Sequence, residues 1–202
     1  PLVDYRRIGY DAATGAVTLP EGMEIDLGSV AKGYAGQLAA QMLRDNGVQS
    51  ALLNLGGNVQ TVGAKPDGSP WQIGIKDPQG EDAMMVLSVE DQAVVTSGGY
   101  ERYFEQDGQT YWHIMDPSTG HPADSGLISV TIVGDEGVVC DGLSTALFVM
   151  GLEKAADLWA QSGDFEAVFV TASGEVYITE GLRDRFALTE QYADTPVSVI
   201  ER

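Results

Sequence analysis

Four β-prone runs follow one another between residues 59 and 96, and the links between them are short. The runs cover 59–64, 71–76, 84–89 and 93–96, and the links are rich in Pro, Gly and Asp. A parallel pair of strands needs a crossover of a dozen or more residues, whereas an antiparallel pair needs only a turn. These links are too short for crossovers, so the sequence predicts a mainly antiparallel sheet.

Other segments extend this sheet and add helices. A turn-rich link at 11–15 predicts a hairpin within the first 27 residues, and an apolar run at 50–55 predicts a strand buried on both faces. Further strands are predicted at 127–133, 167–170 and 176–179, and a helix at 152–162. The expected fold class is α+β in one domain over residues 1–202, mainly antiparallel sheet with two to three packed helices.

A helix is predicted to begin after Ser29, whose hydroxyl can cap it, and to end at Asn46 and Gly47. Its apolar residues recur at helical spacing and are expected on the buried side: Ala31, Ala35, Leu38, Ala39, Met42 and Leu43. The N-terminus of this helix offers free backbone amides to anions, and Lys32 adds a positive charge. The alternative interpretation of Lys32 is a solvated surface lysine.

The segment 140–150 predicts another helix, with a polar first turn followed by core positions at Leu143, Ala146, Leu147 and Met150. Asp141 and Thr145 are four residues apart, so the carboxylate and the hydroxyl lie on the same helix face. Both oxygens could approach a hard cation such as Mg²⁺. The alternative is structural: Asp141 caps the helix and Thr145 packs within it.

Composition limits the possible partners. The formal charge is −19, with only 11 Lys and Arg, which argues against a nucleic-acid partner because phosphate backbones are held by clustered cations. No apolar run approaches the roughly 20 residues of a membrane span. Cys140 cannot form an internal disulfide because it is the one cysteine of the chain, and a buried thiol is expected.

Five short motifs occur in a specific order along the chain. They are Asp-Leu-Gly-Ser-Val-Ala-Lys-Gly-Tyr at 26–34, Asn-Leu-Gly-Gly-Asn at 54–58, Thr-Ser-Gly-Gly-Tyr-Glu-Arg-Tyr at 96–103, His-Ile-Met-Asp-Pro-Ser-Thr-Gly at 113–120 and Asp-Gly-Leu-Ser-Thr-Ala-Leu-Phe-Val-Met-Gly at 141–151. Together they resemble the ApbE family, the FAD:protein FMN transferases. The resemblance implies a T-fold-like architecture and an Mg²⁺-dependent enzyme that moves FMN from FAD to a threonine hydroxyl of an acceptor protein, releasing AMP.

The resemblance also implies roles for individual residues. The metal ligands are the side chains of Asp141 and Thr145 and the carbonyl of Ala31, and the catalytic residues are His113, as proton acceptor, and Asp116. The implied FAD contacts are Ala31, Lys32, Gly33, Asn54, Leu55, Gly56, Gly57, Ser97, Gly98, Tyr100, Arg102, His113, Ile114, Asp116, Pro117, Thr119 and Gly120.

Two other functions stay open, an Mg²⁺-dependent FAD pyrophosphatase that yields FMN and AMP, and a non-catalytic FAD-binding fragment. Members of the family carry further residues before the point that matches Pro1, and that region helps to enclose the adenosine side of FAD. The resemblance further implies a periplasmic or cell-envelope location, with a lipid anchor attached upstream of this chain.

Overall fold

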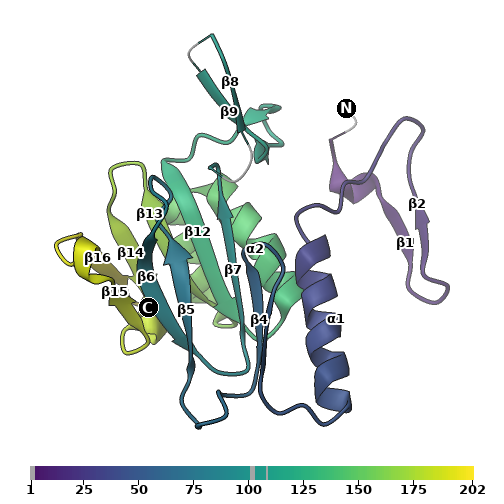
Figure 1. Cartoon of the computed structure of the whole chain (residues 1–202). Helices are drawn as coiled ribbons and strands as arrows, with labels where there is room; N and C mark the ends of the chain where they lie inside the picture. Colours follow the sequence, from purple (N-terminus) through teal and green to yellow (C-terminus); the bar gives the residue numbers. More distant parts are fainter. Residues whose placement is uncertain (1–2, 101–102, 108) are drawn as a thin grey trace.

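A computed structural model describes residues 3–100, 103–107 and 109–202 of the chain. A seven-stranded sheet with the order β16-β14-β13-β12-β7-β4-β3 forms its centre (Figure 1). All neighbouring strands in this sheet are antiparallel except β14 and β16, which are parallel. With three α-helices in the described residues, the structure confirms the predicted α+β class with a mainly antiparallel sheet.

In chain order the elements are η1 (Tyr5–Arg7), β1 (Gly9–Asp11), β2 (Ala16–Thr18), α1 (Ala31–Asp45), β3 (Ala51–Asn54), β4 (Asn58–Val62), β5 (Trp71–Lys76), β6 (Ala83–Val89), β7 (Ala93–Gly98), β8 (Tyr103–Gln106), β9 (Gln109–Trp112), β10 (Met115–Asp116), β11 (His121–Pro122), β12 (Leu127–Gly134), α2 (Gly137–Met150), α3 (Leu152–Ser162), β13 (Glu166–Thr171), β14 (Val176–Thr179), η2 (Glu180–Leu182), β15 (Phe186–Leu188), η3 (Glu190–Tyr192) and β16 (Val197–Ile200).

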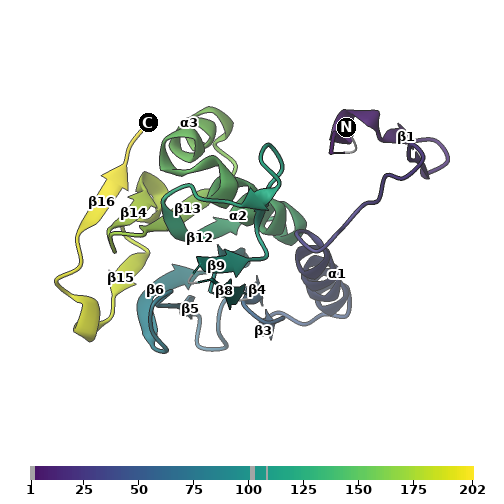
Figure 2. The same ribbon diagram turned by 90° about the horizontal axis from the view of Figure 1, so that it is seen from above.

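The central sheet has a layer packed on each face (Figure 2). Helices α2 and α3 cover one face, where Val130 and Ile132 of β12 pack with Phe148 and Trp159. The three-stranded sheet β15-β6-β5 covers the other face, where Val133 belongs to a second buried cluster. Alternate side chains of a strand point to opposite faces, so β12 contributes Val130 and Ile132 to one layer and Val133, with the buried Ser129 and Thr131, to the other. Strands β5 and β6 belong to the second sheet rather than the central one, and β4 pairs with β7.

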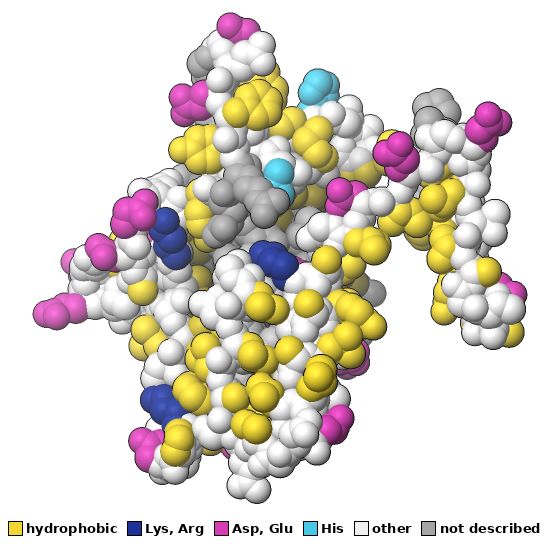
Figure 3. All heavy atoms as spheres, turned by 45° about the vertical axis from the view of Figure 1, so that its right-hand side comes forward, with side chains coloured by type: hydrophobic (Ala, Val, Ile, Leu, Met, Phe, Trp, Pro, Cys, Tyr) yellow, Lys and Arg dark blue, Asp and Glu magenta, His cyan; other side chains and the backbone are white. Residues whose placement is uncertain are grey.

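The inward face of α1 differs from the sequence prediction. Its buried residues are Gly33, Gly36 and Ala40, whereas Leu38 and Met42 are 47% and 66% exposed. Small residues allow the α1 backbone to approach α2 and β4 closely, and they displace the apolar stripe to the surface. Figure 3 shows hydrophobic side chains gathered on the face of the molecule where α1 lies. The predicted cap is also wrong, because the N-cap residue is Val30 and it makes no side-chain cap bond.

Two strand predictions have different outcomes. The hairpin near the N-terminus forms as β1 and β2, which stand apart from the main body in both ribbon views (Figures 1 and 2). The run at 50–55 forms β3, but as an edge strand whose side chains alternate between half-buried and exposed rather than as a buried strand. The next strand, β4, is buried along its whole length. In the described part of the chain no helix is long and apolar enough to span a bilayer.

Helix α2 starts one turn earlier than the sequence suggested, at Gly137. Its N-cap residue is Glu136, so Asp141 is not a cap of this helix and lies within it, 4% exposed. Leu147 is buried as predicted, while Ala146 is exposed and Phe148 contributes to the core instead. A carboxylate buried in the interior of a helix needs a reason beyond capping.

Candidate functional site

The candidate site begins where α1 crosses α2. The backbone N–H of Gly33 donates to Oδ2 of Asp141 across this crossing, at 2.7 Å. Gly33 lies in the first turn of α1, where backbone amides have no partner inside the helix. Asp141 therefore satisfies an amide of the neighbouring helix, and the start of α1 is held against the carboxylate. This contact brings the first and last sequence motifs together.

The surroundings of Asp141 oppose its negative charge only in part. Burial is the dominant influence and raises the pKa of the Asp141 carboxyl, while the Gly33 N–H, the charge of Lys32 and the Asn58 amide act in the opposite direction. A buried carboxylate is costly unless it is paired or bound to a metal. A cation at this point would stabilise the ionised form.

A chain of hydroxyl groups runs beside Asp141, from α2 to β7. Ser144 Oγ donates to the carbonyl of Asp141 at 2.8 Å, and Ser97 Oγ lies 2.8 Å from Ser144 Oγ and 3.1 Å from Thr145 Oγ1. Each hydroxyl has one hydrogen. Because Ser144 uses its hydrogen on the carbonyl, Ser97 donates to Ser144, and Thr145 donates to Ser97. The lone pairs of Thr145 Oγ1 are then available to a cation.

These donors fit the requirements of Mg²⁺, which takes oxygen ligands and is commonly held by one or two carboxylates together with water and phosphate. Asp141 and Thr145 share one face of α2, and Ala31 lies two residues before Gly33, in the turn that contacts Asp141. The described residues contain no cluster of three or more His, Cys, Asp or Glu side chains. A site with a single carboxylate suits a metal that completes its shell with phosphate oxygens.

The turn between β3 and β4 joins this site through Lys32. The backbone of Gly56 and Gly57 has φ of 63° and 83°, a conformation that glycine adopts without strain. The N–H of Gly57 donates to Oδ1 of Asn54 at 3.1 Å, and Lys32 Nζ donates to the carbonyl of Gly56 at 3.2 Å. The second motif is thereby tied to the first, and the FAD contacts of both motifs stay predictions. Leu55 lies exposed in the same turn.

The end of β7 carries the third motif. Ser97 belongs to the hydroxyl chain, and Gly98 is buried against the ring of Tyr100, where an added Cβ would lie 2.8 Å from Cδ1. Lys76 Nζ lies 6.0 Å from the centre of the Tyr100 ring. A side chain at residue 98 would displace this tyrosine. Arg102, which was also predicted to contact FAD, lies outside the described residues.

The loop 113–120 is a self-contained turn. Asp116 Oδ1 accepts hydrogen bonds from the N–H and the hydroxyl of Ser118 at 2.8 and 2.7 Å, and these bonds lower the pKa of the Asp116 carboxyl. The N–H of Gly120 donates to the Asp116 carbonyl at 2.8 Å. His113, Pro117 and Thr119 are exposed.

The position of this loop leaves its predicted roles open. The side chain of Ile114 is packed in the core, so its predicted flavin contact could involve only the backbone. No hydrogen bond in the described structure links the loop to Asp141, and the catalytic roles of His113 and Asp116 stay predictions.

Three buried polar residues of the site were missed at the sequence level: Asn58, Gln60 and Ser144. Asn58 and Gln60 are on β4, whose five residues are all buried. The available signal was the alternation of two amide side chains in a strand that follows a glycine turn. Polar residues at the buried positions of a strand need partners, and here those partners belong to the site.

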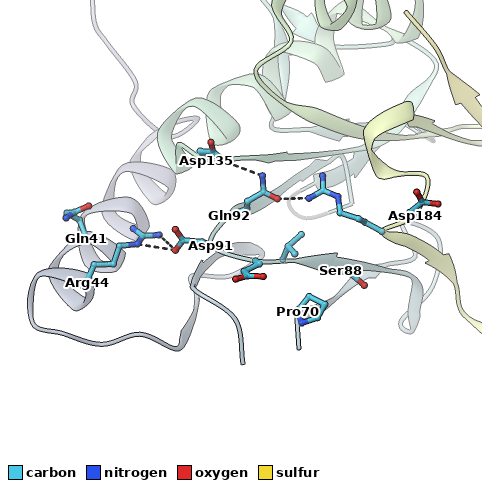
Figure 4. Close-up of a pocket in the computed structure, with 11 residues that line it drawn as sticks. Gln41, Arg44, Pro70, Ser88, Asp91, Gln92, Asp135 and Asp184 are labelled. Carbon is cyan, nitrogen blue, oxygen red and sulfur yellow. Dashed lines mark hydrogen bonds and ion pairs between the residues drawn. The ribbon is translucent and has the colours of Figure 1, made fainter. Parts of the chain in front are cut away.

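A separate cavity of about 840 Å³ lies at the opposite end of β7, and its polar groups already pair with one another (Figure 4). Arg44 Nη2 is 2.7 Å from Asp91 Oδ1, and Gln92 bonds both Arg185 and Asp135, at 2.8 and 3.1 Å. These contacts join the end of α1 to the turn before β7. The polar groups that line the cavity are therefore used in contacts that hold neighbouring elements together, and the cavity is separate from the candidate site.

We expect Cys140 to be chemically inert in the folded protein. The thiol is 1% exposed, and burial raises its pKa to about 12. At pH 8 only about one thiol in ten thousand would be ionised, and the thiolate is the reactive form. A colorimetric thiol reagent should release one equivalent of its coloured group per chain only after the protein is unfolded in guanidinium. Rapid stoichiometric labelling of the folded chain would contradict the buried position.

Comparisons with known proteins show the family of this chain. The chain belongs to the ApbE family, whose model matches residues 1–169. A FAD:protein FMN transferase from Klebsiella pneumoniae is 42% identical over 180 residues, 88% of this chain and 55% of the relative. A protein of the same name from Treponema pallidum is 40% identical over 174 residues, 81% of this chain and 48% of the relative.

Solved structures show the same fold. The crystal structure of the ApbE protein from Thermotoga maritima matches with a TM-score of 0.83 at 38% identity, over 90% of this chain and 60% of that chain. The flavin transferase ApbE from Vibrio cholerae matches with a TM-score of 0.78 at 27% identity, over 90% and 59%. The chain spans about half the length of the curated relatives named above.

Proposed function

We propose that this chain carries the metal and flavin-phosphate site of an Mg²⁺-dependent FAD:protein FMN transferase. One observation carries the proposal: the buried Asp141 accepts the Gly33 N–H and shares a helix face with Thr145, whose lone pairs are free for a cation. Three of the five motifs meet around this point, and a fourth is tied to it through Lys32. The names of the relatives supply the reaction class.

The reaction is a displacement at phosphorus. The hydroxyl oxygen of an acceptor threonine forms a bond to the phosphorus on the FMN side of the FAD pyrophosphate, and the bond from that phosphorus to the AMP oxygen breaks. The hydroxyl proton passes to a base, for which we propose His113 or Asp116. AMP leaves with the electron pair of the broken bond, and FMN remains attached to the threonine as a phosphodiester.

The residues around Asp141 would prepare the pyrophosphate for this step. Asp141, Thr145 and the carbonyl of Ala31 would hold Mg²⁺, which supplies neutralisation of the charge that develops on the phosphate oxygens. Lys32 and the start of α1 would bind the same phosphates. The glycine turn at 56–57 exposes backbone that a flavin phosphate can approach closely. An acidic chain with few cations needs such local positive charge to hold an anionic substrate.

The decisive experiment incubates the chain with FAD, Mg²⁺ and a threonine-bearing acceptor protein. We expect flavin fluorescence on the acceptor after denaturing gel electrophoresis and an equal amount of AMP in solution. FMN and AMP without acceptor would favour the pyrophosphatase, and FAD retention with no AMP would indicate a binding module. If no flavin-labelled acceptor, no AMP and no free FMN form, and FAD does not bind, the proposal is contradicted.

Metal removal gives a second prediction for the same assay. EDTA in excess should stop both acceptor labelling and AMP release, because the charge on the pyrophosphate would lose its main counterion. Addition of Mg²⁺ beyond the chelator should restore both signals, whereas the same ionic strength of NaCl should not. Full activity in EDTA would show that the Asp141 site does not serve a metal in the reaction.

We also propose, from the family resemblance, that the full protein resides in the periplasm or cell envelope and is anchored by a lipid upstream of this chain. Fractionation of cells that express the complete coding sequence, followed by detergent release, would test this location. Recovery in the cytoplasmic fraction would contradict it.

A further inference from the structure

Two amide side chains of β4 lie directly beneath the crossing of α1 and α2. Asn58 is 0% exposed and Gln60 is 4% exposed, and their two-residue spacing places both on the same face of the strand. Gln60 Nε2 donates to Oδ1 of Asn58 at 3.0 Å. Buried amides of this kind are costly unless their donors and acceptors are used.

The Gln60–Asn58 hydrogen bond determines which way the Asn58 amide faces. Its oxygen is the acceptor for Gln60, so its donor, Nδ2, is directed away from Gln60. In the described part of the chain Nδ2 has no hydrogen-bond partner of standard geometry. Asn58 nevertheless lies beside Asp141, and its side chain is one of the polar groups that act on the carboxylate. An ionised carboxylate only accepts hydrogen bonds, and Oδ1 of Asn58 is already the acceptor for Gln60, so Nδ2 is the group of Asn58 that can donate to Asp141.

Gln60 is itself held by the two helices. An added Cβ at Gly36 of α1 would lie 2.8 Å from Gln60 Cγ, and one at Gly137 of α2 would overlap the Gln60 amide. The side chain thus fills a slot that exists because both helices carry glycine at this point. Such tight packing leaves Gln60 little freedom to rotate. The orientation of Asn58 follows from a side chain that cannot easily move.

We propose that Asn58, oriented by Gln60, is a positioning residue that holds the Asp141 carboxylate in the rotamer needed for a divalent cation. This inference rests on the proposed function in one respect, that Asp141 binds a metal. Residues that hydrogen-bond to a metal ligand fix its direction, and their loss typically weakens metal affinity or activity about 10–100-fold. No direct contact between Asn58 and FAD is required.

The test measures Mn²⁺ binding by electron paramagnetic resonance, because it reports the site without catalysis. Asn58→Leu removes the donor at similar volume and should weaken Mn²⁺ affinity about 10–100-fold. Gln60→Met removes the hydrogen bond that orients Asn58. It should also weaken Mn²⁺ affinity, by a smaller factor than Asn58→Leu. In the transfer assay both variants should need more Mg²⁺, regain wild-type rates at high Mg²⁺, and keep the wild-type KM for FAD.

Thr61→Val is the matched control, since Thr61 is also buried in β4 and its hydroxyl bonds Gln92 at the other end of the strand. It should lower the melting temperature and leave Mn²⁺ affinity unchanged. If Asn58→Leu does not fold, Gln60→Met decides alone. Wild-type Mn²⁺ affinity in a folded Asn58→Leu or Gln60→Met would overturn the inference. A wild type that binds Mn²⁺ normally but transfers no flavin would overturn only the proposed function.

Discussion

Asp141→Asn is expected to reduce Mg²⁺-dependent flavin transfer by about a thousandfold or more, with the fold intact. Metal stabilisation of developing phosphate charge is worth several kcal/mol, and each 1.4 kcal/mol is a factor of about ten in rate. The amide keeps an oxygen that can accept the Gly33 N–H, but it lacks the negative charge of the proposed ligand. AMP release and acceptor fluorescence measured over a range of Mg²⁺ concentrations would quantify the loss.

The same substitution should have the opposite effect on stability without metal. Burial raises the pKa of Asp141 above its value in the unfolded chain, so ionised Asp141 destabilises the fold at neutral pH. The asparagine variant should therefore melt at the same or a slightly higher temperature than the wild type. This difference should disappear as the pH falls below the ordinary carboxyl pKa, where Asp141 is neutral in both the folded and unfolded states.

Bound metal should make the wild type more stable than Asp141→Asn, the reverse of the order expected without metal. Mn²⁺ at a hundred times its dissociation constant stabilises a folded protein that binds it by about 2.7 kcal/mol. The wild type should gain this increment and Asp141→Asn should not. Asp157→Asn, at an exposed carboxylate of α3, should behave as the wild type in every assay. An Asp141→Asn protein that unfolds or aggregates would instead assign Asp141 to a purely structural role.

The sequence predicted those features that depend on local spacing. Asp141 and Thr145 share a helix face because four residues separate them, and this holds although α2 begins a turn earlier than expected. The hairpin β13–β14 forms around a Ser-Gly turn, as turn chemistry indicated. Short links also predicted antiparallel pairing correctly, although β5 and β6 join a different sheet from β4 and β7.

Features that depend on tertiary packing were not predictable in the same way. Hydropathy placed Leu38 and Met42 of α1 inside. In the structure Gly33 packs on α2 and Gly36 packs on Gln60 of β4, and the larger residues are exposed. Periodicity counts apolar residues and does not register that a glycine face can approach another backbone more closely.

The candidate site shows the same division between local and long-range features. Each of its motifs can be identified in the sequence. The contacts between motifs cannot, because the Ser97–Ser144 bond joins residues 47 positions apart and the Gly33–Asp141 bond joins residues 108 positions apart. Only the folded chain reveals which motif supplies a partner to which.

Gly33→Ala is expected to damage the site and the fold together. A Cβ at this position would overlap the carbonyl oxygen of Gly137 and lie 2.6 Å from Cβ of Asp141. Both neighbours belong to α2, so the two helices must separate, and overpacking of this kind costs about 1–3 kcal/mol. In a protein of this size each kcal/mol lowers the melting temperature by about 2–4 °C. The displaced Gly33 N–H would no longer hold Asp141, so Mn²⁺ affinity should fall as well.

Gly142→Ala provides the control, because it adds the same methyl group to the same helix pair. Its Cβ would meet Val30 Cγ1 at 3.4 Å, an ordinary contact, and Gly142 lies inside α2. Replacing a helix-interior glycine by alanine without a clash stabilises by up to about 1 kcal/mol. We therefore expect melting temperatures to change in opposite directions, with Mn²⁺ affinity lost in Gly33→Ala alone. Equal and small effects of both substitutions would show that α1 can shift freely on α2, and the start of α1 could not then be what orients the carboxylate.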